Sequence, residues 1–423
     1  MNVSTSARPP YSSFNIEDLQ SRGLATAIIK RLLDEPQWWM SLLRRFWPIA
    51  RVPFIRWAMV TRFEHVQEVL TREEVFQVPF GPRMMELIPG PNFVLAMQDG
   101  DEYQRQRGHI MQAFSLDDIR PIARRSAELA EHIVSGCGGR IDAIEDLLTR
   151  VPTLLCRDYY GIDIRDPKLF AQWTIAVSAY LFGPPSDTPG HKLATARAAA
   201  DGMRALIDQA IADAKRAADR STTIVARLVR MQEQGAGGLS DEMIRAELFG
   251  MVTGFVPTNT IASGNVLEML LRRREFMLPA QAAARDDDDG LLWRCLSETM
   301  RFKPINPGPF RKCAKDYTIA EGSPDATRIR AGTRLLVSTQ SAMFDERSVV
   351  EPKKFRPDRP KHESMLFGYG LHWCIGAFLA AAQITQTFKP LLKKRGLGRA
   401  RGRDGHMQTI GLMPAHLTVE FVP

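Results

Sequence analysis

The longest helical pattern in the chain, residues 241–273, sets the scale of the fold. Thirty helical residues span about 45 Å, which is the width of a whole domain. The chain has 423 residues, 44% of them hydrophobic, and no Gly/Ser-rich or Pro-rich linker divides it. We therefore predict one large domain over residues 1–423, mainly α with a minor β region, in which residues 1–50 form an N-terminal extension that leads into the domain.

Shorter helical patterns surround this long one, and strand patterns are few. Helices are expected over residues 24–34, 63–72, 101–114, 117–136, 143–160, 167–182, 191–217, 291–302 and 376–394. One strand is expected over residues 52–61, two short strand pairs over 316–338, and irregular structure over 76–98.

Charge and cysteine usage narrow the class of protein. The formal net charge is +8, but the positive residues are scattered and no nucleic-acid module is present, so no nucleic-acid partner is expected. The five cysteines are Cys137, Cys156, Cys295, Cys313 and Cys374. They are odd in number, widely spaced and without CxxC pairs, which argues against disulfides and structural zinc and favours a reducing cytoplasm. No apolar run reaches 18 residues, so no transmembrane anchor is expected.

The segment from Trp38 to Trp57 holds four of the seven tryptophans, and four arginines lie among them. Aromatic residues beside arginines suit a membrane interface. Large apolar side chains are nevertheless buried in most proteins. We therefore expect these tryptophans to be packed where the chain enters the core, with peripheral membrane contact as the alternative.

One cysteine stands in a segment that suits a metal-binding thiolate, Phe367 to Gly376 (FGYGLHWCIG). Gly368 and Gly370 permit a tight turn that other residues resist. Cys374 directly precedes an expected helix, whose free N–H groups favour a thiolate. Gly376 leaves room for a flat group against the backbone, and a thiolate facing a planar apolar ligand is what haem iron requires. A buried cysteine beside a glycine turn would explain CxG alone.

The whole pattern FxxGxHxCxG resembles the haem-binding loop of the cytochrome P-450 family. The resemblance implies a triangular, mostly α haem-thiolate fold with haem b (iron protoporphyrin IX) as cofactor. It implies that Cys374 is the axial ligand of the iron, that His372 contacts a haem propionate and that Phe367 packs near the sulfur. Gly368, Gly376 and Gly254 are expected to lie beside the haem.

A glutamate–arginine pair stands upstream of the cysteine, in the order that the family has. Glu298 and Arg301 are three residues apart, so they share one helix face and can pair. Such a pair is ordinary on a surface, but this one resembles the family's ExxR helix, and residues 355–359 resemble its FxPxR segment. The resemblance implies that Glu298, Arg301 and Arg359 form a buried, structural charge network.

Two further positions resemble propionate-binding residues of the family. Tyr103 and Arg107 are spaced i,i+4 where the family often has HxxxR, and Tyr stands where His is common. Arg311, ten residues after Arg301, matches another propionate-binding arginine. Cationic donors form strong charge-assisted hydrogen bonds with carboxylates.

Residues 253–259 depart from the family pattern (A/G)Gx(D/E)T, whose acid and alcohol supply the protons for O–O cleavage. In our alignment Val256 stands in the place of the acid and Pro257 in the place of the threonine. Neither side chain relays a proton, and proline removes a backbone hydrogen bond. Thr258 or Asn259 is expected to serve instead if the helix bulges at the proline; otherwise water serves or the chemistry differs.

The predicted function is a monooxygenase that inserts one atom of O₂ into an apolar organic substrate. A separate ferredoxin or flavodoxin type partner is expected to supply electrons and to dock on a basic face formed by Lys389, Lys393, Lys394 and Arg395. Two rivals stay open: a peroxide-dependent oxygenase or fatty-acid hydroperoxide isomerase that needs no reductase, and a non-catalytic haem- and ligand-binding protein.

The substrate pocket is predicted by segment, from mostly apolar side chains. Its expected lining residues are Phe80, Met84, Met85, Ile88, Phe249, Thr253, Val256, Pro257, Ile305, Pro307 and Phe310.

Overall fold

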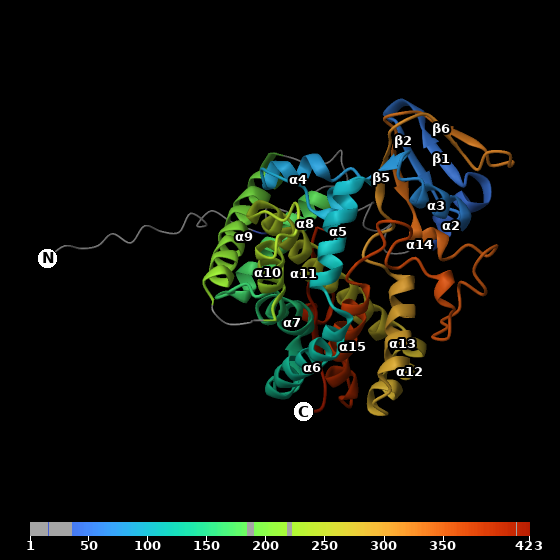
Figure 1. Ribbon diagram of the computed structural model, residues 1–423. Helices are drawn as coiled ribbons and strands as arrows, with labels where there is room; N and C mark the ends of the chain where they lie inside the picture. Colours follow the sequence, from blue (N-terminus) through green and yellow to red (C-terminus); the bar gives the residue numbers. More distant parts are fainter. Residues whose placement is uncertain (1–15, 17–35, 184–189, 218–221, 412) are drawn as a thin grey trace.

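A large helical body and a smaller sheet-containing lobe make up the protein (Figure 1). The computed structural model describes residues 16, 36–183, 190–217, 222–411 and 413–423. The lobe brings together the N-terminal strands and strands from the last third of the chain, so segments far apart in sequence lie side by side there. The helix expected over residues 24–34 falls outside the described residues. None of the described helices is both long and apolar enough to cross a membrane.

The α-helices have the following bounds. They are α2 (Gln37–Phe46), α3 (Phe63–Thr71), α4 (Gly81–Leu87), α5 (Asp101–Ala113), α6 (Ile119–Gly136), α7 (Arg150–Leu155), α8 (Pro167–Phe182), α9 (Gly190–Arg216), α10 (Ile224–Glu233), α11 (Asp241–Arg272), α12 (Arg274–Arg285), α13 (Asp289–Phe302), α14 (Thr339–Ala342) and α15 (Ala377–Lys393). Short 3₁₀ turns are η2 (Pro53–Ile55), η3 (Val94–Ala96), η4 (Leu116–Asp118), η7 (Lys361–Glu363) and η8 (Arg403–Gly405), and π-helical turns are η5 (Ala143–Thr149) and η6 (Cys156–Tyr160).

The strands are short and form small sheets. They are β1 (Ile49–Val52), β2 (Trp57–Val60), β3 (Phe76–Gln77), β4 (Arg140–Asp142), β5 (Phe310–Cys313), β6 (Tyr317–Ile319), β7 (Thr327–Ile329), β8 (Arg334–Val337), β9 (Gly398–Arg399), β10 (Gln408–Ile410), β11 (Met413–His416) and β12 (Thr418–Glu420). The largest sheet has the order β1-β2-β8-β5-β3, in which β2 and β8 are parallel. The others are β4-β12-β9, β10-β11 and β6-β7.

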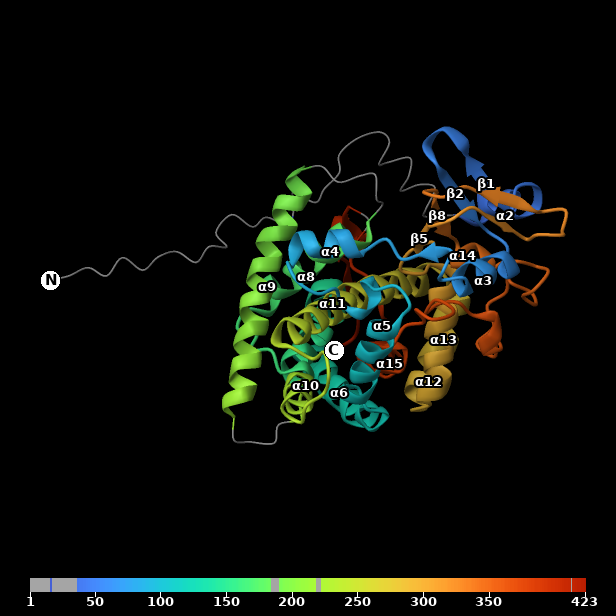
Figure 2. The ribbon, with the colours of Figure 1, turned by 45° about the horizontal axis from the view of Figure 1, so that its top comes forward.

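Helix α11 runs through the middle of the helical body, between α9 on one side and α13 on the other (Figure 2). Its start is fixed by Ser240, whose hydroxyl accepts the Met243 N–H at 3.2 Å, and by two acidic residues in the first turn. Pro257 lies inside the helix without ending it. Its buried side chains belong to the main hydrophobic core, and the sheet lobe has a second core around β2, β5 and β8.

Several elements differ from the sequence prediction. The single strand expected over residues 52–61 is instead the turn and second strand of a hairpin over residues 49–60, because η2 turns the chain between β1 and β2. Helix α4 replaces part of the irregular structure expected over residues 76–98, and the sequence patterns did not predict α2, α10 or α12. Of the strands expected over residues 316–338, β6 and β7 pair with each other, whereas β8 joins the large sheet.

The tryptophans of the N-terminal segment are not all in the core, so that prediction was wrong. Trp38 is 61% exposed and Trp47 is 63% exposed. The inner side of α2 is instead formed by Met40 and Arg44, and the Arg44 guanidinium donates to the carbonyl and hydroxyl of Ser341 at 3.1 and 2.8 Å. The anchoring of this arginine turns the aromatic side of α2 outward.

Candidate active site

The loop before α15 is closed by its own backbone. The N–H of Cys374 donates to the carbonyl of Phe367 at 3.0 Å. Gly370 has φ of 74°, and a Cβ there would lie 2.3 Å from the carbonyl oxygen of Leu70. No other residue type fits this turn without moving α3. The glycine thus holds the loop in a shape that presents the cysteine at the start of the helix.

Cys374 is a half-buried free thiol. Burial raises the pKa of its thiol, while the backbone N–H of Gly376 and the positive charge of Arg107 act in the opposite direction. A Cβ at Gly376 would lie 3.9 Å from the Cys374 sulfur, so the glycine leaves the space beside the sulfur open. The sulfur, two groups that stabilise its anion and free space for a flat ligand suit a thiolate ligand of haem iron.

A cluster of buried charged groups lies on the other side of the loop. The imidazole Nε2 of His372 lies 3.4 Å from one carboxylate oxygen of Glu73, and the Arg311 guanidinium lies 3.9 Å from the other. The Nε of Arg311 and both ring nitrogens of His372 are buried and have no hydrogen-bond partner among the described residues. Buried donors of this kind are rarely left unsatisfied. They fit the carboxylates of a haem, so the residues present suit this cofactor.

Tyr103 and Arg107 are brought to the same cluster from α5. The Tyr103 hydroxyl donates to the carbonyl of Leu371 at 3.0 Å, and Arg107 donates to that hydroxyl at 3.2 Å. The Tyr103 ring also packs edge-on against His372. Tyr103 therefore fastens α5 to the cysteine loop. Its hydroxyl, which was predicted to reach a propionate, is used in this contact. Arg107 keeps donors that the Tyr103 contact does not use.

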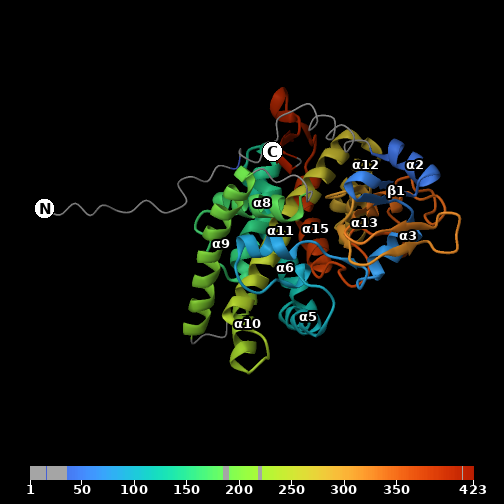
Figure 3. The same ribbon diagram turned by 90° about the horizontal axis from the view of Figure 1, so that it is seen from above.

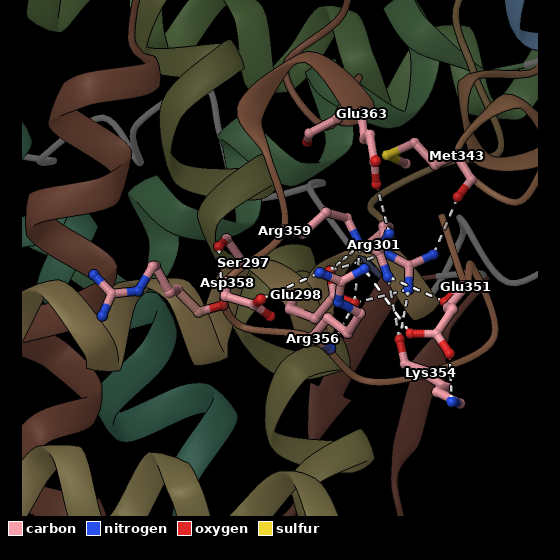
Figure 4. A network of polar contacts seen from close by, with 12 residues as sticks. Ser297, Glu298, Arg301, Met343, Glu351, Lys354, Arg356, Asp358, Arg359 and Glu363 are labelled. Carbon is pink, nitrogen blue, oxygen red and sulfur yellow. Dashed lines mark hydrogen bonds and ion pairs between the residues drawn. The ribbon is translucent and has the colours of Figure 1, made fainter. Parts of the chain in front are cut away.

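Glu298, Arg301 and Arg359 meet in one buried network (Figure 4). Arg301 donates from Nε and Nη2 to the two oxygens of Glu298 at 2.9 and 2.8 Å, and Arg359 donates to the same carboxylate at 3.1 Å. Arg359 also donates to Glu363 at 2.7 Å. Two guanidinium groups thus face two carboxylates, with all four side chains at most 5% exposed.

Backbone groups complete this network. Arg301 donates to the carbonyl of Met343 at 3.1 Å, and the Arg356 N–H donates to Glu298 at 3.1 Å. The network therefore joins α13 to the turn after α14 and to the segment that precedes the cysteine loop. Because every partner is buried, removal of one would leave an unpaired charge inside the protein.

The accessible residues of α11 form one narrow stripe. Between Glu247 and Leu267 the helix is covered by protein except at Met251, Gly254, Thr258 and Ile261. These residues are three or four apart, so they share one face. A Cβ at Gly254 would contact no atom within 4 Å. Because α11 runs through the interior, this face borders an inner space.

Thr258 lies on the accessible stripe, and Val256 and Pro257 lie on covered faces. The Thr258 hydroxyl donates to the carbonyl of Gly254, four residues earlier. This position favours an alignment shifted by one residue from the sequence prediction. In that register Thr258 would stand in the place of the family's threonine, Pro257 in the place of its acid and Phe255 in the place of its glycine.

Two other polar side chains of α11 are buried with unsatisfied atoms. The Asn259 amide donates to the carbonyl of Phe255 at 2.8 Å, but its oxygen has no partner among the described residues. The Thr253 hydroxyl likewise has none. Both residues are buried, at 3% and 0% exposure, and point away from the accessible stripe. Asn259, which we predicted as an alternative proton donor, therefore does not reach the inner space.

The predicted pocket residues divide into three groups by their exposure. Phe80, Ile305, Pro307 and Phe310 are half-buried. Met85 is exposed and lines a surface hollow of about 450 Å³ beside α4. The others have almost no accessible surface in this structure: Met84, Ile88, Phe249, Thr253, Val256 and Pro257.

The basic docking face predicted on α15 is not supported. Lys389 forms ion pairs with Asp287 and Asp289 at 2.9 and 2.8 Å, and Lys393 pairs with Asp287 at 2.6 Å. The Lys394 ammonium lies over the Phe421 ring. At 1.5 Å per residue, the C-terminal turn of α15 lies roughly 20 Å from the cysteine loop at its start.

Sequence reasoning missed two buried carboxylates. Glu73 carries no motif, and its neighbour Glu74 is exposed, so only the fold reveals which of them faces Arg311. Glu247 is fully buried on α11 and accepts the Val94 N–H at 3.0 Å. Burial raises the pKa of Glu247 to about 8. A single acid among apolar neighbours in the helix pattern was a usable signal for Glu247.

Beside Glu247, the ring of Phe93 lies directly on Gly250, where a Cβ would be 2.0 Å from that ring.

The cysteine loop, the donors around it and the mainly helical fold define a haem-thiolate protein. The comparisons agree: residues 45–396 match the model of the cytochrome P450 family. The chain therefore belongs to the cytochrome P450 family, and it is a haem-containing oxidoreductase of the monooxygenase type.

Named relatives and solved structures are distant in sequence. The erythromycin C-12 hydroxylase of Saccharopolyspora erythraea is 24% identical, with 90% of this chain and 93% of that protein covered. The cyclomarin C epoxidase CymV of Salinispora arenicola is 22% identical, with 82% and 85% covered. The crystal structure of CalO2 has a TM-score of 0.79 at 21% identity and covers 93% of this chain and 97% of that one. The fold prediction is thereby confirmed.

Proposed function

We propose that this protein inserts one atom of O₂ into a large apolar organic molecule, using haem b bound by Cys374. The observation that carries the proposal is the cysteine loop, with the unpartnered donors of Arg311 and His372 beside it. When bound, the haem supplies the site at which O₂ is reduced and its O–O bond is cleaved. Arg107, Arg311 and His372 would hold the haem carboxylates, and Gly368 and Gly376 would leave room beside the ring.

Thr258 is the proposed proton donor of the site. It is the hydroxyl-bearing residue on the accessible stripe of α11, and its bond to the Gly254 carbonyl fixes its side chain. The family's acid is replaced by Pro257, so the second proton would come through water. Relatives of this chain are named as hydroxylases and epoxidases, so we do not favour the peroxide-dependent oxygenase, the hydroperoxide isomerase or the non-catalytic protein.

The substrate class is proposed from the lining and the relatives together. Phe80, Ile305, Pro307 and Phe310 offer apolar surface without a charge. Relatives are named for oxidation of erythromycin, cyclomarin C and steroids, all large organic molecules. We also propose a separate ferredoxin or flavodoxin type electron donor, since the family match takes up most of the chain, and a cytoplasmic location, since all five cysteines are free.

Ligation can be tested by absorption spectroscopy of the reduced, CO-bound protein. The native chain should show the red-shifted Soret band of thiolate-bound haem, and Cys374→Ala should lose it completely. Cys137→Ala, a change at a half-buried cysteine elsewhere, is the control and should keep the band. A Cys374→Ala protein that retains the band would overturn the proposal. Turnover of a steroid with NADPH and either a ferredoxin or a flavodoxin system would then identify the type of partner.

A further inference from the structure

Seven large apolar side chains are exposed within a short part of the N-terminal segment. We call this set the N-terminal patch: Trp38 (61% exposed), Leu42 (48%), Phe46 (57%), Trp47 (63%), Val52 (49%), Phe54 (98%) and Ile55 (64%). Single exposed apolar residues are common on proteins, but seven of them on two neighbouring elements mark an interaction surface.

The backbone explains why these residues point outward together. Trp38, Leu42 and Phe46 are four apart, so they form one stripe along α2, opposite the buried Met40. Phe54 and Ile55 lie in the η2 turn at the tip of the β1–β2 hairpin. In all three views α2 and the hairpin lie side by side at the end of the molecule farthest from α9 (Figures 1, 2 and 3).

Positive charge is interleaved with the patch. Arg45, Arg51 and Arg56 are exposed and form no ion pair with a carboxylate among the described residues. The Arg45 guanidinium lies 5.4 Å from the centre of the Phe46 ring, and Arg51 donates to the carbonyl of Arg328 at 3.0 Å. The patch thus combines aromatic side chains with three unneutralised guanidinium groups.

We propose that the N-terminal patch docks the protein on an anionic lipid surface, with the tip of the hairpin and the aromatic stripe of α2 in the headgroup region. Aromatic rings and arginines together suit that region, where apolar surface is buried while cations meet lipid phosphates. A second copy of the chain is a poorer occupant, because it would bring three positive charges against three others. With ten residues, α2 is too short to cross a lipid bilayer, so it would lie along the bilayer surface. This inference does not depend on the proposed enzymatic function.

The test is co-sedimentation of the full-length, haem-loaded protein with vesicles. Vesicles with equal parts of phosphatidylglycerol and phosphatidylcholine should bind it, pure phosphatidylcholine vesicles should bind it weakly, and high salt should reduce binding. Phe54→Ser and Trp47→Ser should each weaken binding about tenfold. Arg45→Gln should weaken it about fivefold at low salt. The reduced, CO-bound spectrum verifies that each variant is intact.

Matched controls lie elsewhere on the surface. Leu116→Ser removes an apolar side chain that is 66% exposed, and Arg165→Gln removes an arginine whose side chain is 90% exposed. Both should bind vesicles like the native chain. Equal binding to neutral and anionic vesicles, or native-like binding by Phe54→Ser and Trp47→Ser, would overturn the proposal. So would a dimer in solution that Phe54→Ser dissociates while the native chain ignores vesicles.

Discussion

The buried polar groups on the two sides of the proposed haem site differ in how completely they are hydrogen-bonded. On the sulfur side, Glu298, Arg301 and Arg359 are buried, but each makes several short hydrogen bonds to charged partners and backbone groups. On the opposite side, along α11, Thr253 and Asn259 are as deeply buried and still leave atoms without a partner among the described residues.

This difference indicates that the charge network on the sulfur side is rigid and that α11 is less tightly held. A fully paired network holds its elements in one arrangement, because any displacement exposes a charge to an apolar interior. A helix with unsatisfied polar atoms and an internal proline has no such restraint. We infer that the sulfur side fixes the position of the cysteine loop and that α11 is where the chemistry of this chain is adjusted.

The largest effect is expected from the sulfur side. Glu298→Ala leaves Arg301 and Arg359 with one buried carboxylate fewer, which costs roughly 3–5 kcal/mol of folding stability. Little haem-loaded protein should be recovered, as measured by the ratio of Soret to protein absorbance. Glu351→Ala, which removes an exposed partner of Lys354, is the control and should load normally. A fully loaded Glu298→Ala protein would show that the charge network tolerates an unpaired charge.

The next effect concerns Glu247 on α11, whose pKa is raised from 4.5 to about 8 by burial. Between these values the unfolded chain has lost the proton while the folded chain keeps it, so folding stability falls as pH rises. In that window the folding stability of the native chain falls by roughly 1.4 kcal/mol for each pH unit. Glu247→Gln removes this pH dependence. Urea midpoints of both proteins, compared from weakly acidic to weakly alkaline pH, measure it.

In that experiment the native chain should match the variant at acidic pH and fall below it at alkaline pH. Glu242→Gln, an exposed acid in the first turn of α11, should show no such divergence. If native and Glu247→Gln midpoints stay parallel across the whole range, Glu247 does not carry its proton into the fold.

A smaller effect separates two threonines of α11. Thr258 and Thr260 both donate to the carbonyl four residues earlier, but only Thr258 lies on the accessible stripe. Thr258→Val should lower product formed per NADH about tenfold, since a lost proton donor diverts electrons to peroxide. Thr260→Val should leave this ratio unchanged. Equal coupling in both variants would assign the relay to water alone.

The smallest effect is expected at Glu73. Its carboxylate faces Arg311 and His372, the same donors that would hold the haem carboxylates. Glu73→Gln removes a competing negative charge and should slow haem release to apomyoglobin about fivefold. Glu74→Gln, at the exposed neighbouring position, is the control. Faster haem release from Glu73→Gln would mean that the carboxylate positions Arg311 instead of competing for it.

The sequence predicted best the features whose geometry is local. The turn around Gly370 and the pairing of Glu298 with Arg301 follow from spacing within one segment, and the structure shows both. Arg359 joined the prediction only through the family resemblance. The face of α11 on which Thr258 lies could not be read from the sequence, because a proline in a helix pattern does not show which face remains accessible.

Long-range placement was beyond the sequence. The partner of Arg311 is Glu73, more than two hundred residues away, and the choice between Glu73 and Glu74 depends on how the segment before β3 lies against β5. The outward stripe of α2 depends likewise on the bond between Arg44 and Ser341. Such contacts are set by tertiary packing, for which periodicity within a segment carries no signal.

The contacts of residues 93 and 94 with α11 bear on how a substrate enters. Phe93 rests on Gly250, and the neighbouring Val94 N–H is held by Glu247, one helical turn away. Because adjacent residues make both contacts, we expect residues 93 and 94 to leave α11 together wherever this segment moves. A substrate that enters past them would then wait for both contacts to break, and the rate of that opening would limit its entry.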